Sequence, residues 1–352
     1  MNRIIICLLS LLATCASAHA APDHVDLTWM SIANMHFSVG DRQIVADGYI
    51  TRLPEDLFFG GGGLDSTRRP VRPDAAAVRE VFTAIGGKAA VNLLLTGHNH
   101  FDHSFDTATW AKLSGAKLIG SPTTCLQVRA EKIPARRCTA VFGGEKIALG
   151  QSIEMYVVRW NHSGDPAKNP AQHNPLELER VPVPNSGGLR AGVAEDFPNG
   201  GGNRAYLFTV DGPAGRLSWF FQDSASPVDL REPIVVGGKN YGAPLDNLSA
   251  AMRAAGVDSV DLWIATGGVG IADLVLPVLK PRAYLPVHWD GLFGAFKAGP
   301  PAPFSDPPLE KLLADAHIAL IKPTQYMDKW RLDRGGVHPL DNAAVKAKLG
   351  FN

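Results

Sequence analysis

The sequence has no excess of charge of either sign. Lysine and arginine together number 34, aspartate and glutamate also number 34, and no long run of like charge occurs. A protein that binds nucleic acid through the phosphates needs a basic excess or a basic patch. The balance of charge therefore argues against nucleic acid as a partner.

Long apolar runs are equally scarce. One at the N-terminus covers residues 4–13 and precedes Ala18-His19-Ala20. A short apolar core before a small-x-small site is typical of a signal peptide, and the run is too short to span a bilayer. We expect residues 1–20 to be removed and the mature chain, from about Ala21, to be periplasmic or secreted with no stable membrane span. A lipid anchor at Cys15 is the less favoured alternative, because the residue before that cysteine fits such a site poorly.

Cysteine is rare as well. Two of the four cysteines, Cys7 and Cys15, fall in the predicted signal peptide, which leaves Cys125 and Cys138 as a pair. In an oxidising compartment we expect this pair to form a disulfide, which would stabilise the chain by about 3 kcal/mol. Two buried free thiols are the alternative, and neither cysteine has the surroundings of a metal ligand.

Hydrophobic periodicity predicts strands and helices over most of the chain. We expect strands at 25–31, 35–39, 43–46, 89–95, 117–119, 147–148, 153–160, 205–210, 217–222, 259–265, 283–287 and 318–321, the last closing the fold. We expect helices at 74–85, 105–113, 121–130, 245–255, 271–279 and 309–316. Strand and helix units of this kind place ligands at the carboxyl ends of parallel strands. One layered domain over residues 21–352 fits this order better than two.

Residues 163–203 interrupt the pattern with a segment rich in Asn, Pro and Gly. The segment is too long for an ordinary connection, and such insertions are often binding loops. We interpret it as a lid or substrate wall, with His173 as a loop or substrate-contact residue. Gly60–Gly63 is interpreted as a loop, because the lysine and helix of a phosphate-binding loop do not follow it.

The most informative stretch runs from Leu93 to His103. An apolar strand leads into a loop that carries His98, His100, Asp102 and His103. Imidazole and carboxylate groups suit zinc and similar divalent ions, and alternate residues of an extended segment share a face. His98 and His100 can therefore bind one ion together, while Asp102 and His103 can point toward a second.

Further candidate ligands follow apolar runs later in the chain. They are His162, Asp223 and His288, each just after a predicted strand. His24, His36, His317 and His338 are lone histidines, which we interpret as surface or packing residues. Trp160 and Trp289 lie next to proposed ligands, but core packing is the favoured role for both.

With these residues in place, the chain resembles the metallo-β-lactamase-fold hydrolases. His98-x-His100-x-Asp102-His103 matches the hallmark loop of that family, the order His162, Asp223, His288 matches its later motifs, and Asp47 matches its first. The resemblance implies an α/β fold, a four-layer αββα sandwich of two mixed β-sheets with flanking helices. The residues around Trp29 and His288 also look like the branch that holds a lactonase and a phospholipase D.

The resemblance further implies a dinuclear metal site. His98, His100 and His162 would hold one ion, Asp102, His103 and His288 the second, and Asp223 would bridge the two. Asp47 would support the loop from behind. The ions would be divalent, with zinc favoured and manganese or iron as alternatives.

The expected activity is that of an exported metal-dependent hydrolase with a small-molecule or lipid-like substrate. A hydroxide shared by the two ions would attack an ester, lactone or phosphodiester, and Asp102 and Asp223 would be the catalytic carboxylates. An exported β-lactamase is an alternative, against which the carboxylate at Asp223 argues. Two further alternatives are a non-hydrolytic di-iron protein and a metal-binding protein without catalytic activity.

Overall fold

The computed structural model describes residues 21–56, 69–150, 152–168, 170, 173, 176–190, 196–198 and 202–351. The predicted signal peptide, the glycine run at 60–63 and parts of the 163–203 insertion lie outside these residues. None of the helices in the described ranges has the length and apolar character needed to cross a membrane.

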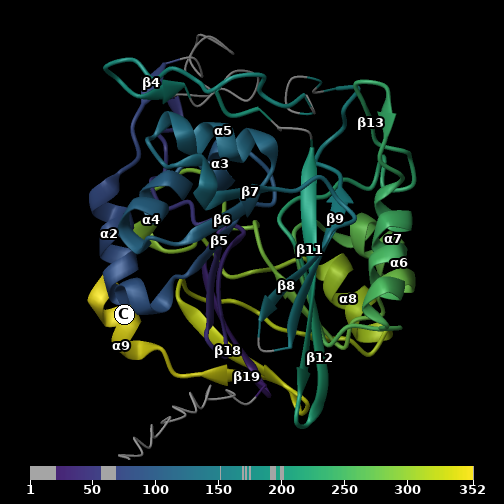
Figure 1. The fold of residues 1–352 in the computed structure, drawn as a ribbon. Coiled ribbons are helices and arrows are strands. Elements are labelled where there is room, and N and C mark those ends of the chain that lie inside the picture. Colours follow the sequence, from purple (N-terminus) through teal and green to yellow (C-terminus); the bar gives the residue numbers. More distant parts are fainter. Residues whose placement is uncertain are drawn as a thin grey trace, which may run out of the picture.

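The first of two large sheets is built mainly from the N-terminal half of the chain (Figure 1). Its strand order is β19-β18-β1-β2-β3-β5-β6-β7. β1 to β3 form antiparallel pairs, whereas β3, β5, β6 and β7 are parallel neighbours. The strands are β1 Val25–Ser31, β2 Asn34–Val39, β3 Arg42–Ala46, β5 Leu93–Leu95, β6 Lys117–Gly120, β7 Cys138–Ala140, β18 Asp328–Asp333 and β19 Gly336–Leu340.

The second sheet has the order β17-β16-β15-β12-β11-β9-β8. Within it β8, β9, β11 and β12 are antiparallel neighbours, and β12, β15, β16 and β17 are parallel neighbours. The strands are β8 Lys146–Gly150, β9 Ile153–Trp160, β11 Asn203–Gly212, β12 Gly215–Gln222, β15 Leu262–Ala265, β16 Ala283–Pro286 and β17 Ala319–Leu320. Two small ribbons join β4 Pro70–Val71 to β10 Leu189–Arg190, and β13 Val235–Val236 to β14 Lys239–Asn240.

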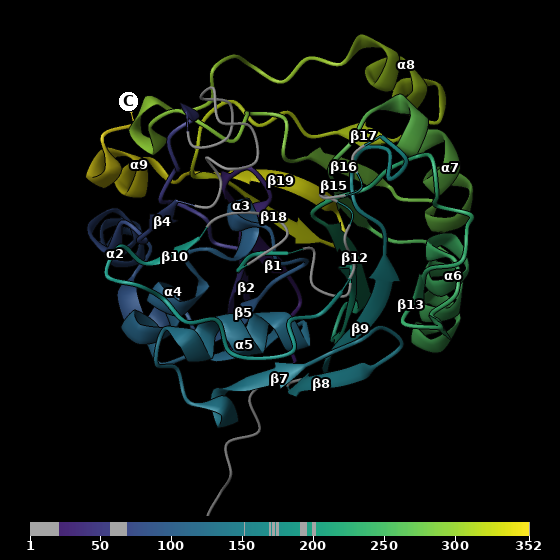
Figure 2. The ribbon, with the colours of Figure 1, turned by 90° about the horizontal axis from the view of Figure 1, so that it is seen from above.

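Helices cover the outer faces of both sheets. Figure 2 shows α2, α4 and α5 outside the first sheet and α6 and α7 outside the second. The α-helices are α2 Ala75–Ala84, α3 Phe101–Ser104, α4 Thr107–Ser114, α5 Pro122–Ala130, α6 Pro244–Ala255, α7 Val269–Leu279, α8 Pro307–Asp315 and α9 Ala343–Leu349. The predicted four-layer αββα sandwich of two mixed sheets is therefore confirmed.

Aromatic side chains fill the space between the two sheets. Phe208 and Trp219 of the second sheet stack with ring centroids 4.6 Å apart, and Phe37 of the first sheet lies 6.0 Å from Phe208. All three are fully buried. Apolar area removed from water stabilises by about 25 cal/mol per Å², so this layer fixes how the sheets lie on each other.

Most predicted elements agree with the structure to within a few residues, and some helix starts carry recognisable caps. The predicted strand 89–95 is present but shorter, because η2 Gly87–Ala90 is a 3-10 helix and β5 begins at Leu93. The Asp74 side chain accepts hydrogen bonds from Ala76 N and Ala77 N at the start of α2. Ser121 Oγ likewise accepts from Thr124 N at the start of α5. Such caps satisfy backbone N–H groups that a helix start leaves unpaired.

Two predictions about elements were wrong. The strand at 318–321 does not close the fold, because β18, β19 and α9 follow it and β18 pairs with β1 of the first sheet. The second half of the hallmark loop is also not a loop. Asp102 and His103 lie on α3, a single helical turn, while His98 and His100 lie on the extended segment before it.

The predicted disulfide is present between Cys125 of α5 and Cys138 of β7. The insertion is held by Glu177, whose carboxylate lies 3.0 Å from Arg204 Nη2 and also accepts a hydrogen bond from Thr123 N. The side chain of Arg204 is fully buried, so this ion pair ties the insertion to both the core and α5.

Candidate metal centre

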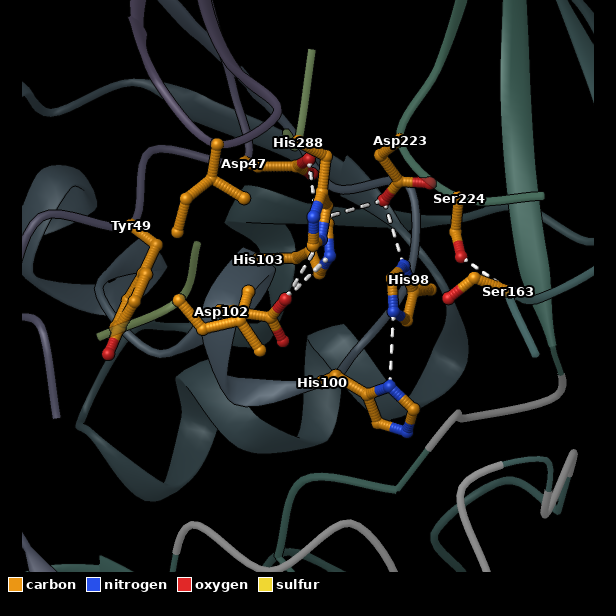
Figure 3. A network of polar contacts seen from close by, with 12 residues as sticks. Asp47, Tyr49, His98, His100, Asp102, His103, Ser163, Asp223, Ser224 and His288 are labelled. Atoms are coloured by element: carbon orange, nitrogen blue, oxygen red, sulfur yellow. Dashed lines mark hydrogen bonds and ion pairs between the residues drawn. The ribbon is translucent and has the colours of Figure 1, made fainter. Parts of the chain in front are cut away.

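The seven predicted ligands come together at one edge of the two sheets, at the carboxyl ends of strands. Figure 3 shows all of them with labels except His162. His98 and His100 follow β5 of the first sheet, and α3 supplies Asp102 and His103. The remaining three residues, His162, Asp223 and His288, follow β9, β12 and β16 of the second sheet.

One cluster contains only histidines. His98 Nε2 lies 3.2 Å from His100 Nδ1, and His100 Nδ1 lies 2.9 Å from His162 Nε2. One hydrogen cannot satisfy three ring nitrogens that converge in this way, whereas one cation can accept all three lone pairs.

The second cluster contains a carboxylate and two histidines. Asp102 Oδ2 lies 3.1 Å from His103 Nε2 and 3.1 Å from His288 Nε2. His288 adopts a left-handed backbone conformation with φ +63°, and its N–H donates to Ile32 O over 2.9 Å. The turn between β1 and β2 therefore holds this ligand in place from the opposite sheet.

Asp223 lies between the two clusters. Its Oδ2 is 2.9 Å from His98 Nδ1 and 3.3 Å from His103 Nδ1, one histidine of each cluster. Its Oδ1 is buried and has no hydrogen-bond partner within the part of the chain that the structure describes. The carboxylate fits only because residue 97 is glycine, since a Cβ there would lie 2.1 Å from Asp223 Oδ2.

Asp47 supports the loop from behind. Its Oδ2 lies 2.9 Å from His103 Nδ1, and its Oδ1 accepts a hydrogen bond from Gly97 N over 3.0 Å. Asp47 N donates to Leu95 O, which fixes the aspartate against β5. A carboxylate on one ring nitrogen orients the other toward a metal, as such partners do around metal-ligating histidines.

Burial keeps the histidine cluster neutral. It lowers the pKa of His100 to about 4 and holds the pKa values of His98 and His162 well below the ordinary value. Neutral imidazole is the form that donates a lone pair to a metal.

The second cluster has the opposite character. Burial would lower the pKa of His103, but the charges of Asp102, Asp223 and Asp47 outweigh it and raise that pKa well above its ordinary value. Burial raises the pKa of Asp47 to about 7, with a further contribution from the charge of Asp223. Three carboxylates around one imidazole therefore favour added positive charge, which either a proton or a metal cation supplies.

The ligand atoms that the structure brings together therefore suit divalent metal ions. Each of three groups offers ligand atoms that lie within 4.8 Å of one another: His98, His100 and His162; His98, His103 and Asp223; and Asp102, His103 and His288. Nitrogen and carboxylate oxygen donors suit zinc, manganese and iron.

Sequence reasoning missed Asp106, which positions the segment after Asp47. Its Oδ2 accepts hydrogen bonds from Ile50 N over 2.6 Å and from Thr51 N over 2.7 Å. Burial raises the pKa of Asp106 to about 6. In the sequence it falls inside a predicted helix, so nothing marks it as a partner of residues more than fifty positions earlier.

Sequence reasoning also missed Asp290, which anchors the segment that carries His288. Both of its carboxylate oxygens accept from Ile32 N, and Oδ2 also accepts from the hydroxyl of Tyr326 over 2.6 Å. An aspartate two residues after a proposed ligand was the available signal, but its partners lie far away in the sequence.

His173 lies beside the histidine cluster. Its ring meets the His162 ring edge-on with centroids 5.1 Å apart, and both residues line a cavity of about 200 Å³ with Trp160, Asn203 and Asp229. Trp160 is fully buried, and Trp289 stacks on Trp29 with centroids 5.2 Å apart, in keeping with the packing roles predicted for both. His36 is also buried, which agrees with a packing role.

No family model matches the chain. Two curated relatives, both named UPF0173 metal-dependent hydrolase, match parts of it. The one from Pyrobaculum arsenaticum is 26% identical over 141 residues, which are 40% of this chain and 52% of the relative. The one from Pyrobaculum islandicum is 31% identical over 72 residues, 20% of this chain and 32% of the relative. The chain thus spans about half the length of the first relative and a third of the second.

Solved structures cover more of the chain. Igni18, described as a novel metallo hydrolase from Ignicoccus hospitalis, covers 88% of this chain and 99% of its own, with a TM-score of 0.50 and 12% identity. The metallo-β-lactamase fold protein YhfI from Bacillus subtilis covers 88% of this chain and 99% of its own, with a TM-score of 0.41 and 10% identity.

The two mixed sheets, the flanking helices and the first of these likenesses define a protein of the metallo-β-lactamase fold. The chain is similar over part of its length to proteins named metal-dependent hydrolases. Its narrower placement in a lactonase and phospholipase D branch stays a prediction.

Proposed function

We propose that the protein is an exported metal-dependent hydrolase that uses two divalent ions, with zinc as the favoured metal. The observation that supports this best is the convergence of His98, His100 and His162 in one cluster and of Asp102, His103 and His288 in another, with the Asp223 carboxylate between them. The relatives named metal-dependent hydrolases point to the same activity.

Paired divalent cations supply a water of lowered pKa and polarise the substrate oxygen under attack. The residues of the chain position that chemistry. His98, His100 and His162 would hold the first ion, and Asp102, His103 and His288 the second. Asp47 holds the loop in place, because it accepts a hydrogen bond from Gly97 N and contacts His103 Nδ1. Gly97 has no side chain and so leaves room for the Asp223 carboxylate.

Asp102 is the carboxylate we propose to orient the attacking water, since α3 places it between His103 and His288. Asp223 is proposed as the shared carboxylate. The cavity beside His162, with His173 in its wall, is proposed to receive the substrate. Apolar residues such as Ile234 and polar groups such as Asn203 both line it, which suits an ester, lactone or phosphodiester with a small polar portion.

Elemental analysis of the purified protein, together with a panel of ester, lactone and phosphodiester substrates and the β-lactam nitrocefin, tests the proposal. We expect close to two divalent ions per chain and turnover of one of the first three substrate classes. His98→Ala should lose metal and turnover together. His338→Ala, which removes an exposed histidine far from the clusters in sequence, should lose neither.

Full metal content and turnover in His98→Ala would overturn the assignment. Turnover of nitrocefin alone would replace the proposed substrate class with β-lactams. Two bound irons without hydrolysis would favour a redox protein on the same fold.

Export is part of the proposal and has its own test. The disulfide between Cys125 and Cys138 supports it, because such bonds persist in oxidising compartments. N-terminal sequencing of the protein from its native host should find a chain that begins near Ala21. A chain that begins at Met1 in the cytoplasm would contradict export and leave the site unaffected.

A further inference from the structure

Arg159 of β9 is a buried cation that has no ion-pair partner among the described residues. The residue is 2% exposed, and within the described chain its guanidinium makes one hydrogen bond, from Nη1 to Phe142 O over 3.2 Å. Its Nε is buried and has no hydrogen-bond partner in the described ranges. A guanidinium carries five N–H groups, so most of its hydrogen-bonding capacity is unused.

The neighbouring Arg204 shows what a satisfied buried arginine looks like in the same region. Its Nη2 lies 3.0 Å from the carboxylate of Glu177, its Nη1 donates to Gly202 O, and its Nε donates to Val141 O. Arg159 has no carboxylate within ion-pair distance among the described residues. Burying an unpaired charge is unfavourable, so a protein that keeps one usually supplies a counter-charge from elsewhere.

Arg159 lines a cavity of about 280 Å³ on the outer side of β9 toward α6. The ring of Tyr241 forms one wall, with its centroid 4.5 Å from Arg159 Cζ, and Asn247 of α6 and the backbone of Gly143 and Gly144 form others. The volume equals several water molecules at about 30 Å³ each. A ligand group larger than a single water therefore has room beside the guanidinium.

The other charged groups of this cavity are already engaged. Glu145 accepts hydrogen bonds from Phe142 N and Gly143 N, and Lys146 Nζ lies 2.7 Å from the carboxylate of Glu154. Lys239 Nζ lies 4.6 Å from the Tyr241 ring and adds positive charge nearby. Arg159 is thus the cation of the cavity that has no ion-pair partner among the described residues. Glu145 has none either, but its carboxylate oxygens already accept the two backbone hydrogen bonds.

We propose that this cavity is a second ligand site, which binds a small anion through a carboxylate or phosphate group on the guanidinium of Arg159, against the Tyr241 ring. A guanidinium pairs such groups with two parallel N–H donors, and aromatic stacking leaves its edge free to do so. The cavity shares no lining residue with the one beside His162, so the site is separate from the proposed substrate pocket.

Thermal unfolding and calorimetric titration of the full chain with sodium phosphate and with sodium succinate test the proposal, with ionic strength held constant by sodium chloride. We expect the unfolding midpoint to rise by roughly 2–3 °C at ten times the dissociation constant of the anion that fits. Arg159→Met should abolish the rise. Arg216→Met is the matched control, because that arginine is partly exposed and paired with Asp211, and it should keep the full response.

Phosphate also binds metal ions, so the titration is repeated in the His98→Ala protein with a chelator present. The response should persist there, which separates this site from the metal centre. Arg159→Lys covers the case in which Arg159→Met does not fold. It keeps the charge but loses the planar donor pair, and it should weaken binding about tenfold or more.

Equal affinity in Arg159→Lys and the unmodified chain, or an undiminished rise in Arg159→Met, would overturn the proposal. The absence of any response to phosphate and succinate in the unmodified chain would do the same. A response that disappears only in His98→Ala would assign the anion to the metal centre instead.

Discussion

Replacing Gly97 by alanine should disable the metal centre by a purely steric route. A Cβ built on Gly97 would lie 2.1 Å from Asp223 Oδ2 and 2.3 Å from Asp223 Cγ. Ordinary contacts of such atoms begin near 3.4 Å, so the carboxylate must move by more than 1 Å. The backbone of Gly97 lies outside the left-handed region, so the substitution adds crowding without backbone strain.

The displacement has two measurable consequences. Asp223 would leave its contacts of 2.9 Å and 3.3 Å with His98 and His103, and a misplacement of about 1 Å in an active site costs about 100-fold in rate. Overpacking of a buried site typically costs about 1–3 kcal/mol of unfolding free energy. We therefore expect Gly97→Ala to fold with reduced stability, to bind metal less tightly and to lose about 100-fold of any hydrolytic activity.

Gly270→Ala provides the matched control. Its Cβ would meet Pro227 at 3.7 Å, an ordinary contact, and it lies exposed in α7 away from the clusters. Metal content by mass spectrometry, turnover and urea unfolding should be unchanged in this variant within experimental error. A Gly97→Ala protein with the same metal content and turnover as Gly270→Ala would refute the reasoning about Asp223.

Three further perturbations probe the supporting contacts. Asp47→Ala removes the acceptor behind His103 and should weaken metal binding about 10–100-fold in equilibrium dialysis; an unchanged affinity would deny Asp47 its supporting role. Glu177→Ala removes the carboxylate that lies 3.0 Å from the buried Arg204 guanidinium. It should lower the unfolding free energy by about 3 kcal/mol in urea titrations, the lower end for a buried pair because Glu177 is partly exposed, whereas Glu179→Ala next to it should have little effect. Burial lowers the pKa of His36 to about 4. The ordinary histidine pKa is about 6.5, so as the pH falls the unfolded chain takes up this proton before the folded chain does. Stability should therefore fall by up to about 3 kcal/mol between pH 6.5 and pH 4. His36→Leu should flatten that part of the pH profile, and an identical profile would show that His36 does not contribute.

The sequence was informative wherever one short segment contains both the chemistry and its scaffold. His98, His100, Asp102 and His103 lie within six positions after an apolar strand, so a metal cluster could be predicted without knowledge of the fold. The fold class followed from the resemblance that this loop carries. His162, Asp223 and His288 could be proposed because each follows an apolar run, and the structure places all three beside the loop.

The rest depends on contacts that periodicity does not encode. Asp106 and Asp290 act on backbone N–H groups far away in the sequence, at Ile50 and Ile32. The pairing of β18 with β1 likewise joins the two ends of the chain. In the sequence Arg159 is one charged residue within a predicted strand. The structure shows that its charge is buried beside a cavity.

The position of the clusters also explains why both sheets are needed to build them. His98 to His103 follow a strand of the first sheet, whereas His162, Asp223 and His288 follow strands of the second. Protein contacts already cross this boundary, since Arg204 N donates to Gly97 O over 2.8 Å and the Tyr206 hydroxyl donates to Thr96 O over 2.7 Å. These bonds fix the loop against the second sheet whether or not metal is bound. The aromatic layer between the sheets and these two hydrogen bonds therefore preorganise the site, so that metal binding need not supply the free energy of bringing the sheets together.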